Sequence, residues 1–242
     1  MPASQRIHVL SDIHADVWQA HALATAPAQV QATGHVALDA QLPGGGWPLG
    51  AMTEVLQDPG VHCEWRLLLP ALVRCGQGPV VLVGAPQLPF APALEAQGLS
   101  AHRLLWVVAQ HTAQRLWAAE QALRCAAVDA VLLWVPSAVR TDPLRRLQMA
   151  AAQYSKLLFV MRPAQAQAEG SPAVLRLQVE PDPQQTDALA VHLRKRRGPP
   201  LEQPLRLQAR TAQLSMLLAL NPGPFIPGLP MSLPRHRDAL DR

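Results

Sequence analysis

The sequence predicts an α/β fold: a mostly parallel central sheet flanked by helices, with an antiparallel extension towards the C-terminal end. Short apolar runs alternate with helical segments through the first two thirds of the chain. Most of these runs are apolar on both faces, which is typical of buried parallel strands. A chain of 242 residues with 49% hydrophobic content can bury one substantial core of this kind.

Strand–helix–strand units account for the first part of the chain. Thr112 is predicted to cap a helix through Arg124, and Thr141 or Asp142 a helix through Tyr154, because their side-chain oxygens accept hydrogen bonds from a helix's first N–H groups. Strands joined by such helices favour a doubly wound sheet. The predicted strands of this sheet are Met52–Leu56, Pro79–Val83, Leu104–Val108, Ala130–Val135 and Leu157–Met161.

After Pro163 the pattern changes to an antiparallel meander. Its predicted strands are Ala173–Glu180, Ala188–Arg196 and Leu205–Ala209, with Pro- and Gly-containing breaks at 181–183 and 198–200. The predicted organisation is therefore a leader at 1–32, a core at 33–210 and an irregular Pro- and Gly-rich tail at 211–242.

Composition favours a cytoplasmic protein without a zinc site or a disulfide framework. The net charge of +4 permits contact with nucleic acid without requiring it. Cys63, Cys75 and Cys125 are odd in number and contain no C-x-x-C pair, so they favour neither a disulfide framework nor a zinc site. No signal peptide is recognised at the first residues, and the apolar runs fall far below the roughly 18 residues that span a membrane.

Residues 50–69 have the outline of a phosphate loop without its chemistry. An ATPase carries G-x-x-x-x-G-K-[ST] here, and its lysine reaches the phosphates while the next hydroxyl holds Mg²⁺. In this chain Cys63 and Glu64 stand at the positions of the lysine and the hydroxyl. They follow Gly60 and His62, the other loop positions that we consider. A carboxylate about 4 Å from a phosphate oxygen is repelled by roughly 4 kcal/mol at an effective dielectric near 20. Only the backbone amides at the helix start are left to attract an anion weakly.

Thr33-Gly34 and Leu38-Asp39, followed by the glycines of residues 44–50, resemble the approach to the phosphate loop in the RecA core. More closely, residues 42–50 (LPGGGWPLG), Thr53-Glu54 and residues 67–70 (LLLP) resemble the ImuA family, the RecA-like accessory proteins of bacterial mutagenic translesion synthesis. The resemblance covers about residues 33–210 and implies a RecA-like P-loop NTPase fold. It also implies a non-catalytic adaptor in SOS-induced translesion DNA synthesis and DNA repair. The implied partners are ImuB, a DnaE-type error-prone polymerase and RecA itself, with only indirect contact to DNA.

Carried across from RecA, the remaining functional positions also lack the expected chemistry. The glutamate that activates water aligns with Pro86, which cannot act as a base. The magnesium-associated aspartate aligns with Trp134, and the residue that senses the γ-phosphate aligns with Arg162. The resemblance therefore implies a pseudo-ATPase, with no catalytic residue and no bound metal or cofactor.

Four tryptophans extend this interpretation. We hypothesise that Trp65 and Trp134 fill the space that phosphate and magnesium would occupy. Trp106 and Trp117 lie in apolar strand and helix patterns, so we expect ordinary burial in the core.

Two other functions stay open. Residues 67–70, 97–99, 117–124 and 160–163 also resemble SulA, a degenerate RecA-like inhibitor that binds FtsZ and blocks its polymerisation. SulA-type chains are shorter and lack the glycine-rich approach around Gly44, so ImuA is favoured. An ATP-dependent DNA enzyme is disfavoured by the residues at positions 63, 64, 86 and 134.

The strongest positive cluster is Arg194-Lys195-Arg196-Arg197. On a strand, alternation would send Arg194 and Arg196 to one face and Lys195 and Arg197 to the other. The cluster is a candidate contact for DNA phosphate or an acidic partner, and a solvated strand end with protective edge charges explains it equally well.

A second short motif lies near the N-terminus. Asp12 and His14 resemble the first motif of metallophosphoesterases, in which an aspartate and a histidine two apart bind one metal of a pair. The later motifs of that family are missing from the chain. Chance spacing in a leader is therefore the favoured interpretation.

Overall fold

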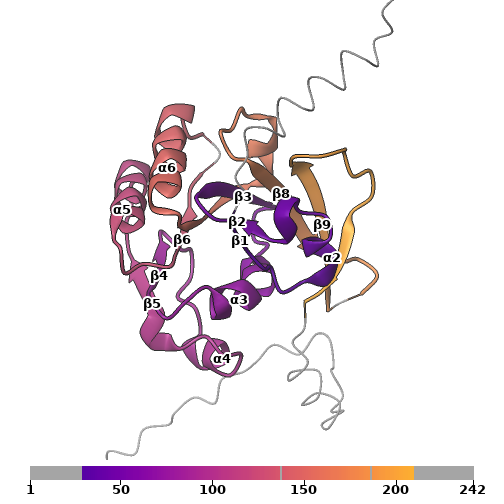
Figure 1. Cartoon of the computed structure of the whole chain (residues 1–242), viewed down its shortest axis with the longest axis horizontal. Coiled ribbons are helices and arrows are strands. Elements are labelled where there is room, and N and C mark those ends of the chain that lie inside the picture. The colour runs from indigo at the N-terminus through magenta and orange to yellow at the C-terminus, as the bar shows by residue number, and fades with distance from the viewer. Residues whose placement is uncertain (1–28, 137, 186, 210–242) are drawn as a thin grey trace, which may run out of the picture. The chain divides into compact units, whose positions relative to one another are not determined.

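An eight-stranded sheet organises the chain, in the order β10-β9-β8-β3-β7-β6-β4-β5 (Figure 1). The structure is a computed structural model and describes residues 29–136, 138–185 and 187–209. The strands of this sheet are β3 (Ala51–Gln57), β4 (Val80–Val83), β5 (Leu104–Val107), β6 (Ala130–Trp134), β7 (Leu157–Pro163), β8 (Leu175–Pro181), β9 (Ala188–Lys195) and β10 (Leu205–Gln208).

Six of these strands run parallel to one another, from β8 through β3, β7, β6 and β4 to β5, and this confirms the predicted mostly parallel sheet. The antiparallel extension is also confirmed, since β9 pairs antiparallel with β8, and β10 with β9. The strand β8 belongs to both parts, because it pairs parallel with β3 on its other side. A sequence pattern could not place it there, since the partner strand lies more than 100 residues earlier in the chain.

Helices cover both faces of the sheet (Figure 1). Alternate residues of one strand point to opposite faces, and in β4 Leu82 joins the core beneath α3 while Val81 joins the core beneath α5 and α6. The helices are α2 (Val36–Asp39), α3 (Glu64–Arg74), α4 (Ala91–Glu95), α5 (Thr112–Arg124) and α6 (Thr141–Tyr154), with 3-10 turns at Pro43–Gly45, Ala101–Arg103 and Ala164–Ala168.

Two helix starts differ from the predicted caps. Thr112 is the first helical residue of α5, and the preceding His111 caps the helix, with Gln114 reaching back to the His111 backbone N–H at 3.4 Å. Arg140 precedes α6, and no side chain caps it. Both predicted caps are wrong by one or two residues, because preference for a hydroxyl or carboxylate is only a statistical guide to the boundary.

The prediction of burial in the core is wrong for two tryptophans. Trp106 is 41% exposed on the edge strand β5, and Trp117 is 65% exposed on α5. The face of α5 that packs on the sheet carries Leu116 and Leu123 instead, so Trp117 lies outside the buried stripe despite its apolar side chain.

A second, two-stranded sheet packs the glycine-rich segment. The strand β1 (Val30–Gln31) pairs antiparallel with β2 (Trp47–Pro48). A Cβ at Gly46 would lie 2.4 Å from the Gln31 carbonyl oxygen, so only glycine allows the two segments to approach this closely. The described part of the predicted leader, residues 29–32, thus takes part in this sheet. The rest of the leader and the predicted tail at 211–242 lie outside the described residues.

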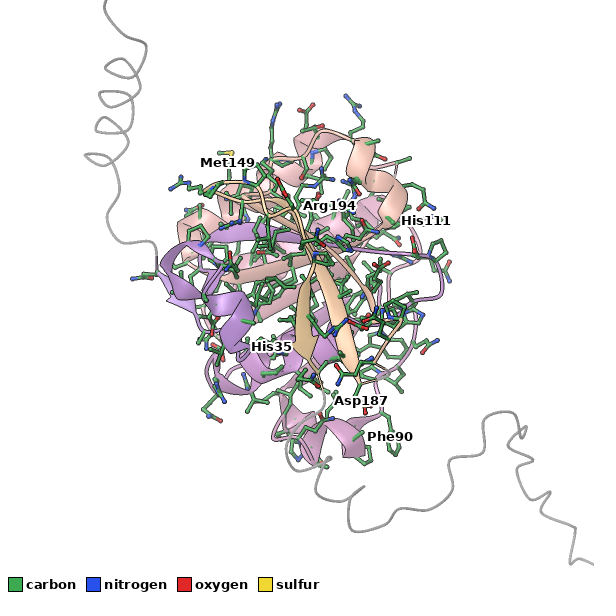
Figure 2. All side chains as sticks on the ribbon, turned by 90° about the vertical axis from the view of Figure 1, so that its right-hand side faces the viewer. His35, Phe90, His111, Met149, Asp187 and Arg194 are labelled. Atoms are coloured by element: carbon green, nitrogen blue, oxygen red, sulfur yellow. The ribbon has the colours of Figure 1, made fainter. Side chains whose placement is uncertain are left out.

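His35, labelled in Figure 2, immediately precedes α2, and its ring is held against α3 by a hydrogen bond to Leu67. Gly34 adopts φ +85°, and a Cβ there would lie 2.4 Å from the Pro70 side chain. The ring Nε2 lies 3.1 Å from the Leu67 carbonyl oxygen and donates to it. Burial is the largest influence on His35 and lowers its pKa below the usual 6.5, so the folded state favours the neutral ring.

Acid is therefore expected to destabilise the fold through His35. Below pH 6.5 the unfolded chain binds a proton at this residue that the folded chain does not. The free energy of unfolding then falls as pH falls, by at most about 1.4 kcal/mol per pH unit for one such group. Urea unfolding of the wild type, His35→Gln and the exposed His102→Gln at pH 7.5, 6.5 and 5.5 measures this. We expect a smaller pH dependence in His35→Gln alone, and equal slopes in all three proteins would contradict the assignment.

Candidate functional site

A cavity lies where four parallel strands of the sheet end. Its volume is about 650 Å³, and residues 57–62 after β3, 84–86 after β4, 134–136 at the end of β6 and 161–163 at the end of β7 form its walls. Gln110, Thr112 and Arg115 complete the lining from the start of α5. Ligands of open α/β sheets bind at the carboxyl ends of the strands, and small-molecule sites span about 300–1,000 Å³. This cavity is therefore the candidate site.

The N-terminus of α3 points its first amides at a side chain of the same molecule. With the Gln57 amide oxygen facing the helix, it accepts hydrogen bonds from the backbone N–H groups of Cys63 and Glu64 at 3.0 and 3.1 Å. The amide nitrogen donates to Glu64 Oε2 at 3.1 Å. The free N–H groups of a helix start are what bind a phosphate in a phosphate loop. Here Gln57 engages two of them.

The two altered loop positions lie behind the cavity wall. Glu64 is buried, with 4% of its side chain exposed, and His62 Nδ1 lies 3.8 Å from its Oε1. Burial raises the pKa of the Cys63 thiol, which therefore stays neutral. Gly60 and His62 line the cavity, whereas Cys63 and Glu64 do not. The sequence pattern missed Gln57, because a side chain that reaches back from the end of a strand to a helix start leaves no fixed spacing.

The structure brings the two predicted lost acidic positions to the same cavity. Pro86 and Trp134 both line it, from the ends of β4 and β6. Trp134 is 9% exposed, whereas Trp65 is not part of the lining and packs half-buried against the core beneath. The hypothesis that both rings fill the nucleotide space is wrong for Trp65, and the cavity beside Trp134 stays open.

Arg162, the predicted equivalent of the phosphate sensor, is held in a buried ionic network with Glu54. Its Nη1 lies 3.2 Å from Glu54 Oε1, and its Nη2 contacts Glu169 Oε2 at 2.5 Å. Arg176 Nε donates to Glu54 Oε2 at 2.7 Å, and Ser171 Oγ donates to Glu54 Oε1 at the same distance. The side chains of Glu54 and Arg162 are both fully buried. Two arginines thus balance two glutamates where β3, β7 and β8 lie side by side.

Sequence reasoning singled out Glu54 and Arg162 separately and missed their pairing. They are 108 residues apart, and only the register of β3 against β7 brings them together. A buried arginine that is hydrogen-bonded to two carboxylates serves the fold, because its charge is already neutralised within the chain.

The predicted basic cluster lies at the end of β9, where Figure 2 labels Arg194. The strand ends at Lys195, so the predicted alternation does not extend through Arg197. Arg194 donates to Gln178 Oε1 at 2.7 and 3.1 Å, and Lys195 donates to the Ser171 carbonyl oxygen at 3.1 Å. Arg196 donates to the Gln41 and Pro199 carbonyl oxygens at 2.7 and 2.9 Å.

These contacts give most of the basic cluster a structural role. Three of its four side chains are used in hydrogen bonds that tie β9 to neighbouring segments. Arg197 is exposed and forms no hydrogen bond to another described residue. Arg197 is therefore the member of the cluster that we retain as the candidate for a contact with DNA or a partner.

Metal-binding groups, cysteines and apolar helices were sought among the described residues. No group of three histidine, cysteine, aspartate or glutamate side chains is arranged to hold a metal ion in the part of the chain that the structure describes. Cys63, Cys75 and Cys125 are free cysteines. Among the helices of the described ranges, none has the length and apolar character to cross a bilayer. Asp12 and His14 lie outside the described residues.

Neither a protein-family model nor a curated protein corresponds to the chain. Function is therefore inferred from the cavity and from the sequence resemblance.

Proposed function

We propose that the chain is a non-catalytic RecA-like adaptor that acts in the cytoplasm in SOS-induced translesion DNA synthesis and DNA repair. Its resemblance to ImuA names the partners, which are ImuB, a DnaE-type error-prone polymerase and RecA. In this proposal the chain contributes a docking surface, and the partners carry the chemistry.

The contact that carries the proposal is the engagement of the α3 amides by Gln57. A phosphate at this position would need the N–H groups of Cys63 and Glu64, and both already donate to the Gln57 oxygen. A buried carboxylate, Glu64, lies beside them and would repel the phosphate. The helix start is therefore stabilised from within, without a nucleotide.

Cys63 behind the cavity wall, and Pro86 and Trp134 on it, support the same conclusion. Cys63 provides a neutral thiol in place of a lysine. Pro86 and Trp134 offer neither a base nor a carboxylate for Mg²⁺ at the ends of β4 and β6. Among the described residues, these three positions thus provide no lysine, no base and no Mg²⁺ ligand, and the cavity stays open to a partner.

Binding measurements with the purified full-length chain test the proposal. We expect ATP and Mg²⁺ to cause no saturable change in tryptophan fluorescence at micromolar concentrations, with RecA as the positive control. We expect the chain to bind ImuB encoded in the same genome and to leave FtsZ polymerisation unchanged. Measurable ATP turnover would overturn the non-catalytic assignment. Inhibition of FtsZ without binding of ImuB would favour the SulA-like alternative.

A further inference from the structure

Arg115 is a positioned cation on the wall of the candidate cavity. Its Nε donates to the Ala109 carbonyl oxygen at 2.8 Å, and its Nη1 donates to the Trp134 carbonyl oxygen at 3.1 Å. The side chain lies across Gly84, where a Cβ would come within 2.6 Å of Arg115 Cδ and Nε. The absence of a side chain at Gly84 thus makes room for Arg115. The two carbonyl groups then fix the orientation of its planar guanidinium.

The charge of Arg115 is not neutralised by a carboxylate within the described residues. No described carboxylate lies within the 4.0 Å that defines an ion pair, and Nη2 makes no hydrogen bond to another described residue. The other arginine of the lining, Arg162, is bound to Glu54 and Glu169. Asp58 also lines the cavity, but it does not pair with Arg115.

The surroundings of Arg115 favour a single carboxylate as the ligand. A guanidinium presents parallel N–H groups that match the two oxygens of a carboxylate. A polyphosphate would need further donors, but the amides at the start of α3 are engaged by Gln57, and prolines have no backbone N–H. Much of the remaining wall is apolar and suits the apolar part of a peptide segment. It is formed by four prolines and a tryptophan: Pro59, Pro86, Pro136, Pro163 and Trp134.

We propose that this cavity seats an acidic side chain of the protein partner against the guanidinium of Arg115. The inference rests on the adaptor function proposed above and names the chemistry by which the partner is recognised. Aspartate or glutamate on an extended segment would enter from the open side of the cavity and form a charge-assisted pair with Arg115. The prolines and Trp134 would exclude water around that pair and strengthen it.

Affinity measurements with full-length chains test the proposed pairing of Arg115 with an acidic side chain of the partner. Titration calorimetry would compare binding of ImuB by the wild type, Arg115→Gln, Arg115→Lys and the control Arg145→Gln, whose side chain is 66% exposed. Removing one partner of a buried charge pair weakens binding by roughly 30-fold or more. We expect that loss for Arg115→Gln, a smaller loss for Arg115→Lys, which keeps the charge, and less than about 2-fold for Arg145→Gln. Thermal melting checks that each variant is folded.

A double-mutant cycle identifies the acidic residue. Peptides that tile ImuB locate the binding segment, and each of its acidic residues is changed to the matching amide. One of these changes is expected to have no further effect in the Arg115→Gln background, because the pair is already broken. Equal binding by folded wild type and Arg115→Gln would overturn the proposed pairing of Arg115 with an acidic side chain, but not the adaptor function. Failure of the wild type to bind ImuB would overturn both the adaptor function and the pairing.

Discussion

Replacement of Glu54 by alanine is expected to lower the free energy of unfolding by about 3–5 kcal/mol, which is the usual effect of removing one member of a buried ion pair. Glu54 accepts hydrogen bonds from Arg162, Arg176 and Ser171, and its side chain is fully buried. Without it, the buried Arg176 loses the carboxylate with which it pairs, and the buried Arg162 loses one of its two glutamate partners. Urea denaturation followed by circular dichroism measures the loss.

A matched surface pair provides the control for Glu54. Asp142 and Arg145 lie 3.3 Å apart on α6 and are 71% and 66% exposed, so Asp142→Ala is expected to change stability by less than about 1 kcal/mol. Replacing Glu54, Arg162 and Arg176 together by methionine is expected to recover much of the loss, because no uncompensated buried charge remains. If Glu54→Ala were no more destabilising than Asp142→Ala, the network would not contribute as described.

Trp47→Ala is expected to lower the free energy of unfolding by a similar amount, about 3–5 kcal/mol, because it opens a large cavity in the core. Trp47 is fully buried in β2 and packs edge-on against Phe159 of β7, with ring centroids 5.3 Å apart. This contact joins the small sheet to the main one. The same urea titration measures the effect.

Two further variants separate packing from the polar part of the indole. Trp47 Nε1 is buried without a hydrogen-bond partner among the described residues. Trp47→Phe loses volume but also removes this unsatisfied group, so we expect a much smaller loss than for alanine. Trp117→Ala, which removes an indole that is 65% exposed, is expected to stay within about 0.5 kcal/mol of the wild type. Equal losses at Trp47 and Trp117 would contradict the assigned roles.

The glycine-rich segment illustrates how a sequence motif acquires a physical meaning. From the sequence alone, residues 42–50 carried a family resemblance. In the structure, Gly46 permits the close approach of Gln31, and Trp47 anchors the segment in the core. Within the described residues, the glycine-rich segment therefore contributes to packing. It lies more than ten residues before Cys63 and Glu64 in the chain.

The loop itself was only half predictable. Local sequence predicted a strand, a turn and a helix start within residues 50–69, which β3 and α3 confirm. The residue types at positions 63 and 64 led to the further prediction that no nucleotide is bound. Local sequence could not show that Gln57 binds the helix amides or that Glu64 is buried, because both depend on how the turn closes. The exposed Trp106 and Trp117 were missed for a related reason, since apolar character does not tell which face of an element is covered.

The sequence by itself determined the alternation of strands and helices, the parallel character of the first strands, and a cysteine and a glutamate at positions 63 and 64 in place of a lysine and a hydroxyl. These follow from local apolar periodicity and from residue identity at single positions. Tertiary structure alone decided that Glu54 pairs with Arg162 and Arg176, that β8 joins β3, and that Arg115 lies over Gly84. Each of these contacts joins segments far apart in the chain, and the register that brings them together is set by packing of the whole sheet.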